Sequence, residues 1–357
     1  MNDIIVIGGG IAGLSAAARL APHAKVTVLE SEEALGYHAS GRSAAMYEAQ
    51  YGLPTTIALN LASGDFHRDH KGGYLSARGI LFAARAHERN IFEAENKAMK
   101  MNEVTPQEAI DLVPILNPET VAFAAFHEDA FDLDTDRMMQ DFARDIRAHG
   151  GEIHLKSPVT AIDKPGKWQI HAGGQMHETK MVVNAAGAWA DQVAAMAGIN
   201  PLGLTPCRRS MARIPAPRGH DISNWPMFFG TGERWYAKPD AGQLIVSPAE
   251  EDPVDPMDAW ADDMVLAEGF ERYQEMVTEP VERVTANWAG LRTFSPDRAL
   301  VLGRSVEDSS FVWSAGQGGY GFQTAPAASQ LVADLALGHA PELEADLVTA
   351  LSPQRFA

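Results

Sequence analysis

The chain has 357 residues, of which 46 % are hydrophobic and 21 % are charged, and its formal net charge at pH 7 is −18. This composition is typical of a globular protein and the length favours two domains. The negative charge would repel phosphate backbones and anionic lipids, so nucleic-acid and membrane-surface partners are not expected.

Location and metal binding are constrained by what the sequence lacks. An apolar strand begins at residue 3, which leaves no room for a signal peptide, and no run of about eighteen apolar residues occurs, so we expect a cytoplasmic protein without a transmembrane segment. Cys207 is the only cysteine, which excludes an intrachain disulfide and a cysteine-based metal cluster. His67 and His70 lack the spacing and the glutamate of a metalloprotease helix. We therefore expect no metal site and a solvated helix face for this pair.

Residues 3–30 predict a strand, a glycine-rich loop, a helix, a second strand and a terminal acid. Gly8 permits a tight turn, Gly10 lets the backbone approach a pyrophosphate, and Gly13 lets helix and strand pack closely. The free amides and the positive dipole end of the helix favour an anion. Glu30 ends the second strand, where its carboxylate can bind the ribose hydroxyls and would repel a 2′-phosphate. The unit therefore predicts a site for FAD or NAD rather than NADP.

Two later segments continue the α/β pattern. Helical periodicity predicts a helix over Asp136–His149 that ends at Gly150 and Gly151. Strands are expected at Glu152–Leu155, Val159–Asp163, Trp168–His171 and Met181–Asn184. From about Asp297 onward we expect a strand over Phe311–Ser314 and a helix over Thr324–Leu337, where Pro326 is tolerable only in the first turn.

The segments between them have the pattern of an antiparallel sheet with a few helices. Strands are expected at Tyr74–Ala84, Val121–His127, Met211–Ile214, Arg234–Lys238 and Leu244–Ser247, and helices near Asn90–Met101 and Leu266–Val277. We predict an α/β fold with a Rossmann-like nucleotide domain of the glutathione-reductase type, formed by residues 1–45, 134–205 and 295–357. A second, mainly antiparallel substrate domain would comprise residues 46–133 and 206–294, and would close a pocket against the first.

Three further segments distinguish between the two cofactors. The loop over residues 36–45, with Arg42 and Ser43, suits a pyrophosphate, although a polar surface loop is the alternative. The strand ending in Ala185, Ala186 and Gly187 permits a close approach to a dinucleotide, although tight helix packing explains it nearly as well. The glycine-rich loop over residues 316–321 precedes a helix whose N-terminus would stabilise negative charge on a reduced flavin. This loop is hard to explain for NAD and favours FAD.

At this point the chain resembles the D-amino-acid oxidase-like flavoproteins, and among them the bacterial D-arginine dehydrogenase type. The resemblance rests on VIGGGIAGLSAA, GYHASGRSAAMYEAQYG, VVNAAGAWAD, PLGLTPCRRS, YAKPDAG, NWAGLRTF and GQGGYGFQT, which span nearly the whole chain. It implies that FAD lies with its ring between the domains. The positions that would bind the cofactor are Gly8, Gly10, Ile11, Ala12, Gly13, Glu30, Ser31, Gly41, Arg42, Ser43, Ala44, Ala45, Val159, Ala186, Gly187, Trp189, Gly290, Gly318, Gly319, Tyr320, Gly321, Phe322 and Gln323.

The resemblance also implies a reaction and the residues that carry it. Arg209 and Arg292 would bind a substrate carboxylate, Tyr51 and Tyr236 would line the pocket, and Gln323 would lie beside the flavin. On sequence alone, Arg209 fits a solvated pair with its neighbour and Arg292 fits a structural salt bridge. The implied reaction is oxidative deamination of a D-amino acid: hydride passes from Cα to flavin N5, and the imino acid hydrolyses to a 2-oxo acid and ammonia.

Several alternatives stay open within this reading. The substrate can instead be glycine, an N-methyl or secondary amino acid, or a 2-hydroxy acid, because the arginines would bind only the carboxylate that all of these share. A flavin-binding subunit without catalysis is the alternative from another class. Stereochemistry rests on the resemblance alone. The electron acceptor, whether dioxygen, a quinone or a carrier, and the oligomeric state are not determined by the sequence.

The chain departs from the D-arginine type at two positions. Met46 replaces a histidine that could bond the substrate amine, and Ile80 or a neighbour stands where that type places a glutamate for the guanidinium. We therefore expect a preference for neutral or apolar side chains over cationic ones. The stretch Gly290–Asp297 holds no cysteine at the position where related enzymes attach flavin, so noncovalent FAD is expected.

Overall fold

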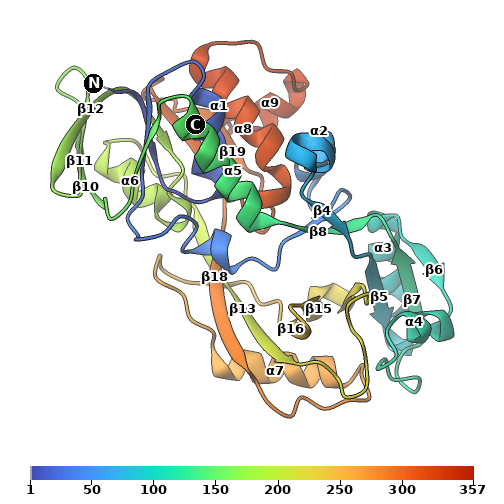
Figure 1. The fold of residues 1–357 in the computed structure, drawn as a ribbon. Coiled ribbons are helices and arrows are strands. Elements are labelled where there is room, and N and C mark those ends of the chain that lie inside the picture. Colours follow the sequence, from blue (N-terminus) through green and yellow to red (C-terminus); the bar gives the residue numbers. More distant parts are fainter. Residues whose placement is uncertain (1) are drawn as a thin grey trace.

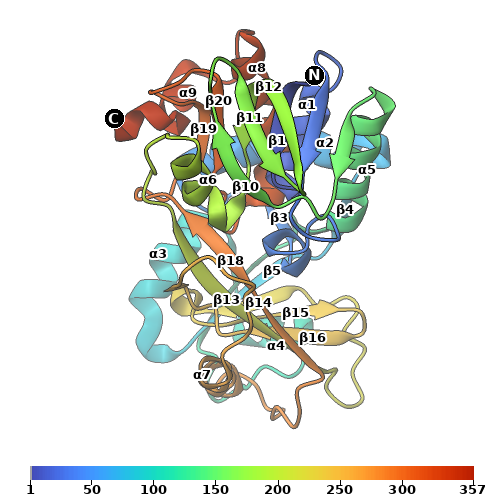
Figure 2. The same ribbon diagram turned by 90° about the vertical axis from the view of Figure 1, so that its left-hand side faces the viewer.

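The computed structural model describes residues 2–357, which form two large sheets and one small sheet (Figures 1 and 2). The first large sheet has eight strands around a parallel centre. Its parallel strands are β1 (Asn2–Ile7), β2 (Val26–Leu29), β9 (Glu152–His154), β12 (Gln175–Asn184) and β20 (Phe311–Ala315). Antiparallel partners are β10 (Val159–Asp163), β11 (Trp168–Ala172) and β19 (Val301–Arg304).

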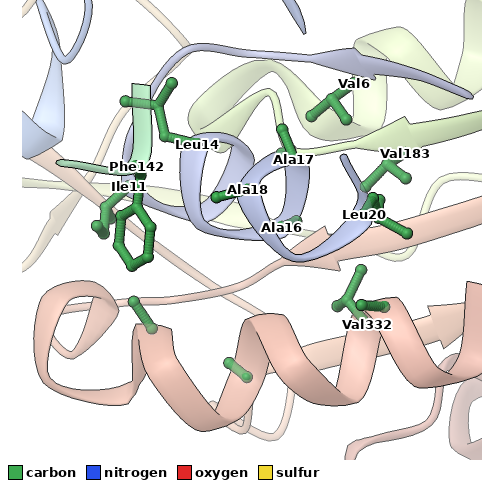
Figure 3. Close-up of a cluster of buried hydrophobic side chains, with 14 of the residues drawn as sticks. Val6, Ile11, Leu14, Ala16, Ala17, Ala18, Leu20, Phe142, Val183 and Val332 are labelled. Carbon is green, nitrogen blue, oxygen red and sulfur yellow. The ribbon is translucent and has the colours of Figure 1, made fainter. Parts of the chain in front are cut away.

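Both faces of this sheet are covered by apolar side chains. Ile4 and Val6 of β1 lie in one core cluster, and the alternate residues Ile5 and Ile7 lie in another. This continuous apolar run is typical of a parallel strand buried on both faces. One face packs on α1 (Ile11–Leu20), α5 (Thr135–Ala148) and α8 (Gly321–Leu337), and the other on α6 (Ala190–Met196). Figure 3 shows α1 between Val6 and Val183 of the sheet and Val332 of α8.

The second large sheet has nine strands, and all of its pairs are antiparallel except that of β5 with β14. Its strands are β5 (Ile80–Ala84), β6 (Asn102–Val104), β7 (Phe123–His127), β13 (Thr205–Pro215), β14 (Met227–Gly230), β15 (Tyr236–Asp240), β16 (Gln243–Ser247), β17 (Asp252–Pro253) and β18 (Ala286–Phe294). Helices α3 (Arg89–Met99), α4 (Pro106–Leu112) and α7 (Asp263–Gln274) accompany it. In Figure 2, the long strands β13 and β18 run from the first sheet into this lower part of the molecule.

The small sheet joins β3 (Met46–Glu48), β8 (Ala130–Leu133) and β4 (Leu75–Ala77) between the two large ones. Helix α2 (Pro54–Asp69) packs on α8, and α9 (Ala345–Leu351) lies near the C-terminus. Leu59 of α2 belongs to the same core cluster as α1. The fold class predicted from the sequence, an α/β part with a second, mainly antiparallel part, is confirmed, whereas the residue limits of the two domains stay a prediction.

Several sequence-based elements differ from the structure. The strand expected over Tyr74–Ala84 is two strands, because Gly79 turns the chain with a φ of +73°. Helix α8 begins three residues before the expected Thr324, so Pro326 lies inside the helix rather than in its first turn. His67 was expected on a solvated face and is instead fully buried. The helices α2, α4 and α9 and the strands β8 and β18 were missed.

Candidate active site

A cavity of about 560 Å³ lies between the glycine loop after β1 and the second large sheet. Most of the residues proposed from the sequence line it together: Gly8, Gly10, Ile11, Ala12, Glu30, Ser31, Arg42, Ser43, Ala44, Ala45, Tyr51, Val159, Ala186, Gly187, Trp189, Arg209, Tyr236, Gly290, Arg292, Gly318, Gly319, Gly321, Phe322 and Gln323. They come from stretches of the chain separated by more than three hundred residues, from Gly8 to Gln323. The fold therefore gathers the proposed cofactor and substrate residues around one space.

Gly13, Gly41 and Tyr320 are not among the described residues that line this cavity. A Cβ on Gly13 would lie 1.9 Å from the Gly8 carbonyl oxygen, so Gly13 allows α1 to pack closely against the loop. Gly41 donates its N–H to the Gly36 carbonyl at 2.6 Å and closes the turn before Arg42. Tyr320 precedes α8, and its ring centroid lies 5.4 Å from that of Tyr51.

The glycine loop and Glu30 form one end of the cavity. Gly8 has a φ of +111°, a backbone conformation that favours glycine. The Glu30 carboxylate accepts the Gly9 N–H at 2.6 Å and the Glu32 N–H at 2.9 Å, which fixes it at the end of β2. Ser40, which the sequence analysis missed, accepts the Ile11 N–H at 3.0 Å in the first turn of α1. This end therefore combines a helix N-terminus with a buried carboxylate.

Arg42 lies where the two large sheets meet, and we call its contacts with Asp258, Ala259 and Ala289 the seam. Its Nη1 donates to the carbonyl of Ala259 at 2.8 Å and to that of Ala289 at 3.0 Å. The Nη2 atom forms an ion pair with Asp258. These bonds direct the guanidinium to the loop before α7 and to β18. Arg42 also lines the cavity, and the pyrophosphate contact expected from the sequence stays a prediction.

Arg209 and Arg292 lie on the same face of the β13–β18 pair. Arg209 is opposite Gly290 in the register, and Arg292 is opposite Cys207, so the two arginines are diagonal neighbours. A Cβ on Gly319 would lie 2.8 Å from the Cζ atom of Arg292, so a larger residue at position 319 would clash with the guanidinium. The solvated pair considered for Arg209 is not observed, because Arg209 is only 3 % exposed.

Two adjacent glutamates hold these arginines from outside the cavity. Arg209 donates from Nε to the Glu250 carbonyl at 2.8 Å and from Nη2 to the Glu251 carboxylate at 3.0 Å. Glu251 also pairs with Arg292 at 3.7 Å and with Arg298. Burial and the Arg292 cation lower the pKa of Arg209. Burial also disfavours the charge on Arg292. Neighbouring tyrosines and glutamates outweigh this effect and raise the pKa of Arg292; they are Tyr51, Tyr236, Glu233 and Glu251.

Tyr51 and Tyr236 line the cavity near the two arginines. The Tyr51 hydroxyl donates to Glu233 at 2.6 Å, and burial together with this carboxylate raises the pKa of Tyr51 well above its usual value. Tyr51 therefore stays protonated at neutral pH. Tyr236 lies in β15 opposite Phe229 of β14 and is buried. Glu233 itself lines the cavity, and sequence analysis missed it because it lies on a turn 182 residues from its partner.

The remaining wall of the cavity is mainly apolar. Met46 and Ile80, at the positions where the sequence departs from the D-arginine type, line it with Met99, Met227 and Phe229. These five side chains lie in one hydrophobic cluster. Glu48 also lines the cavity; it is buried, accepts the Gln50 N–H at 2.9 Å, and lies 3.0 Å from His127.

Gln323 is fixed by two other parts of the chain. Its side-chain oxygen accepts the Glu48 N–H at 3.1 Å, and its backbone carbonyl accepts a hydrogen bond from His67 Nε2 at 2.9 Å. His67 therefore serves a structural role in α2. Among residues 2–357 no cluster of His, Cys, Asp or Glu with metal-binding geometry occurs. In the same range, every helix is too short or too polar to span a bilayer.

Comparison with known proteins agrees with this arrangement. Residues 3–335 match the model of the family described as DAO, FAD dependent oxidoreductase. The chain belongs to this family. A glycine oxidase from Bacillus licheniformis is 24 % identical, with 96 % of this chain and 95 % of the relative covered. The structure of glycine oxidase from Geobacillus kaustophilus has a TM-score of 0.85 at 21 % identity, covering 99 % of this chain and 98 % of its own.

L-Proline dehydrogenase from P. horikoshii has a TM-score of 0.84 at 24 % identity, covering 99 % of this chain and 97 % of its own. The protein is thus an FAD-dependent oxidoreductase. The residues of the cavity fit that cofactor. Gly10 leaves the loop open, the α1 N-terminus favours a pyrophosphate, and Glu30 presents a carboxylate at the end of β2, as a ribose-binding acid would.

Proposed function

We propose that this protein oxidises a D-amino acid, giving an imino acid that hydrolyses to a 2-oxo acid and ammonia. The observation that carries the proposal is the placement of Arg209 and Arg292 as diagonal neighbours in the wall of the same cavity that the glycine loop after β1 lines. Two guanidinium groups at one place suit a carboxylate, which arginine binds through paired hydrogen bonds. When bound, FAD supplies the two-electron acceptor for the hydride that leaves Cα.

The residues around the arginines would orient the substrate. The carboxylate would bind to Arg209 and Arg292, while Tyr51 and Tyr236 close the space beside them. Because Tyr51 keeps its proton and donates it in a hydrogen bond to Glu233, it cannot act as a base at neutral pH. Met46 leaves this part of the site without an imidazole. The substrate amine would therefore bind in its neutral form without a protein base at this position.

The test is anaerobic mixing of the FAD-loaded protein with D- and L-amino acids, glycine, N-methylglycine and L-proline, with the flavin absorption band recorded. We expect bleaching by D-amino acids and release of ammonia. Arg292→Met should lower kcat/KM at least 100-fold, whereas Arg218→Met, at an exposed pair with Glu282, should have no effect. Bleaching by no amino acid would disprove the proposal.

Glycine or a secondary amino acid is the second candidate, because the similar proteins include a glycine oxidase and an L-proline dehydrogenase. Stronger bleaching by glycine or L-proline than by any D-amino acid would favour it. The 2-hydroxy acids are separated by the same assay, because their oxidation releases no ammonia.

A neutral or apolar substrate side chain fits the wall formed by Met46, Ile80, Met99, Met227 and Phe229. Four glutamates line the cavity, and Glu30 and Glu32 lie at the end formed by the glycine loop. The other two already have partners: Glu233 accepts a hydrogen bond from Tyr51, and Glu48 lies against His127. We therefore expect kcat/KM for D-leucine to exceed that for D-arginine by at least tenfold. Ile80→Glu should reverse this order, whereas Ile80→Val should preserve it. A wild-type preference for D-arginine would contradict the argument.

We further propose that FAD is held without a covalent bond. Cys207, the only cysteine, is buried on β13 opposite Arg292 and is not among the described residues that line the cavity. Acid precipitation should leave a yellow supernatant and a colourless pellet. A yellow pellet would contradict noncovalent binding.

A further inference from the structure

Glu251 contacts three arginines at the proposed carboxylate site. Its Oε1 accepts a hydrogen bond from Arg209 at 3.0 Å and lies 3.7 Å from Nη1 of Arg292, and its Oε2 pairs with Arg298. The Arg209 side chain is 4 % exposed and that of Arg292 is 23 % exposed, whereas Arg298 is 48 % exposed. Glu251 is not among the described residues that line the cavity. It therefore contacts Arg209 and Arg292 from outside the cavity.

This position has two physical consequences. Two buried guanidinium groups without a counter-charge would repel each other and would be costly to desolvate. Glu251 gives Arg209, Arg292 and Arg298 one negative charge, and Glu233, which lines the cavity, gives Arg292 a second. Three positive and two negative charges leave a single net positive charge at this place. The hydrogen bonds from Arg209 to Glu251 and to the Glu250 carbonyl also fix the plane of its guanidinium. The Glu251 side chain thus contributes to the charge of the site and, with the Glu250 carbonyl, to the orientation of Arg209.

We propose that Glu251 is a positioning and specificity-determining residue that limits the site to one substrate carboxylate. The proposal rests on the proposed function, since it assumes that Arg209 and Arg292 bind the carboxylate. A monoanion neutralises the remaining charge, whereas a dianion would bring an excess negative charge close to Glu251. Amino acids with a second carboxylate would be excluded for the same reason.

The experiment measures anion binding by the FAD-loaded enzyme, with acetate and malonate as probes. Binding is followed by the change in the flavin absorption spectrum and, independently, by the shift in Tm. Glu251→Gln retains an acceptor for Arg209 but removes the charge. Because the attraction scales with the charge of the ligand, we expect roughly threefold tighter binding of acetate and roughly tenfold tighter binding of malonate.

Glu251→Asp is the matched variant, since it retains the charge and shortens the reach. It should weaken acetate binding and show no gain for malonate. Glu282→Gln, which removes a carboxylate from an exposed pair with Arg218, should bind both anions as the wild type does. Tm measured without anions identifies a variant that fails to fold, in which case the aspartate variant decides.

Equal binding of both anions by Glu251→Gln and the wild type would overturn the proposal. It would also be overturned if the aspartate variant gained malonate affinity, or if neither the wild type nor Glu251→Gln bound any anion. These outcomes are distinct from failure of the proposed function, which is shown by the absence of flavin bleaching with every amino acid while anion binding still responds to Glu251.

Discussion

At the scale of single residues, the glycines of the loop after β1 serve two different purposes, close packing of the backbone and access for a ligand. Gly13 faces backbone: its Cβ would lie 1.9 Å from the Gly8 carbonyl oxygen. Gly10 faces the cavity, and its Cβ would meet only the Ser40 hydroxyl at 3.2 Å. A backbone atom cannot move aside easily, whereas a serine side chain can. One glycine is therefore needed for folding and the other for the ligand.

We predict different effects of alanine at these two positions. Gly13→Ala should destabilise the protein by about 3 kcal/mol or more, because the clash lies in a close-packed core. Gly10→Ala should change the stability of the FAD-free protein by less than about 1 kcal/mol but weaken FAD binding at least tenfold, because the pyrophosphate needs close backbone approach. Urea unfolding and FAD titration measure the two quantities. Equal stability of the two variants would contradict this division.

The element that most affects the site indirectly is α2, whose inner face carries buried polar residues. Asn60, Ser63 and His67 are fully buried and lie against α8 and β3. Pro326 has no N–H and interrupts the hydrogen-bond ladder of α8. At this break, His67 donates to the Gln323 carbonyl and Ser63 accepts the Ala327 N–H at 3.1 Å. Helix α2 thereby supports the proline-containing turn that presents Gln323.

His67 gives this element a pH dependence. Burial lowers its pKa to about 4 from the usual 6.5, so the folded state binds fewer protons than the unfolded state between these values. The contribution of neutral His67 to the free energy of unfolding is therefore complete above about pH 6.5. It is lost as the pH falls toward 4, and the loss is at most about 3 kcal/mol. In urea unfolding, the advantage of the wild type over His67→Gln should shrink by about 2 kcal/mol between pH 7.5 and 4.5. The exposed variant His149→Gln is the control, and a constant difference would contradict the argument.

The same elements show what the sequence can predict. The βαβ unit was found because its glycines and Glu30 act on neighbours within about thirty residues, where spacing carries the information. Glu251, Glu233 and the pairing of β13 with β18 were missed because their partners lie far along the chain, 42 residues for Arg209 and 182 for Tyr51. Helix α2 was missed because its buried face is polar, which conceals the apolar periodicity that predicts a helix. The proposed arginines and tyrosines were named through the family resemblance.

At the scale of the whole molecule, the cavity depends on how the two large sheets are held together. The strands β13 and β18 run from the second sheet toward the first (Figure 2), and they hold Arg209 and Arg292 in the cavity wall. Arg42 crosses the seam to the carbonyls of Ala259 and Ala289, and the Trp288 indole donates back to the Arg42 carbonyl at 3.1 Å. The site residues thus keep their relative positions through contacts that are not themselves part of the chemistry.

Arg42→Met tests whether this arginine joins the two parts of the molecule or binds the cofactor directly. If Arg42 joins the two sheets, the variant removes the donor of two carbonyls and the cation paired with Asp258, and the FAD-free protein should lose about 2–4 kcal/mol of stability. If its role is the pyrophosphate, only FAD affinity should fall and the FAD-free protein should unfold as the wild type does. We expect the first result, with weaker FAD binding as a consequence of the displaced wall. Urea unfolding without FAD distinguishes the two, and Arg218→Met, at an exposed pair, provides the baseline for losing an arginine.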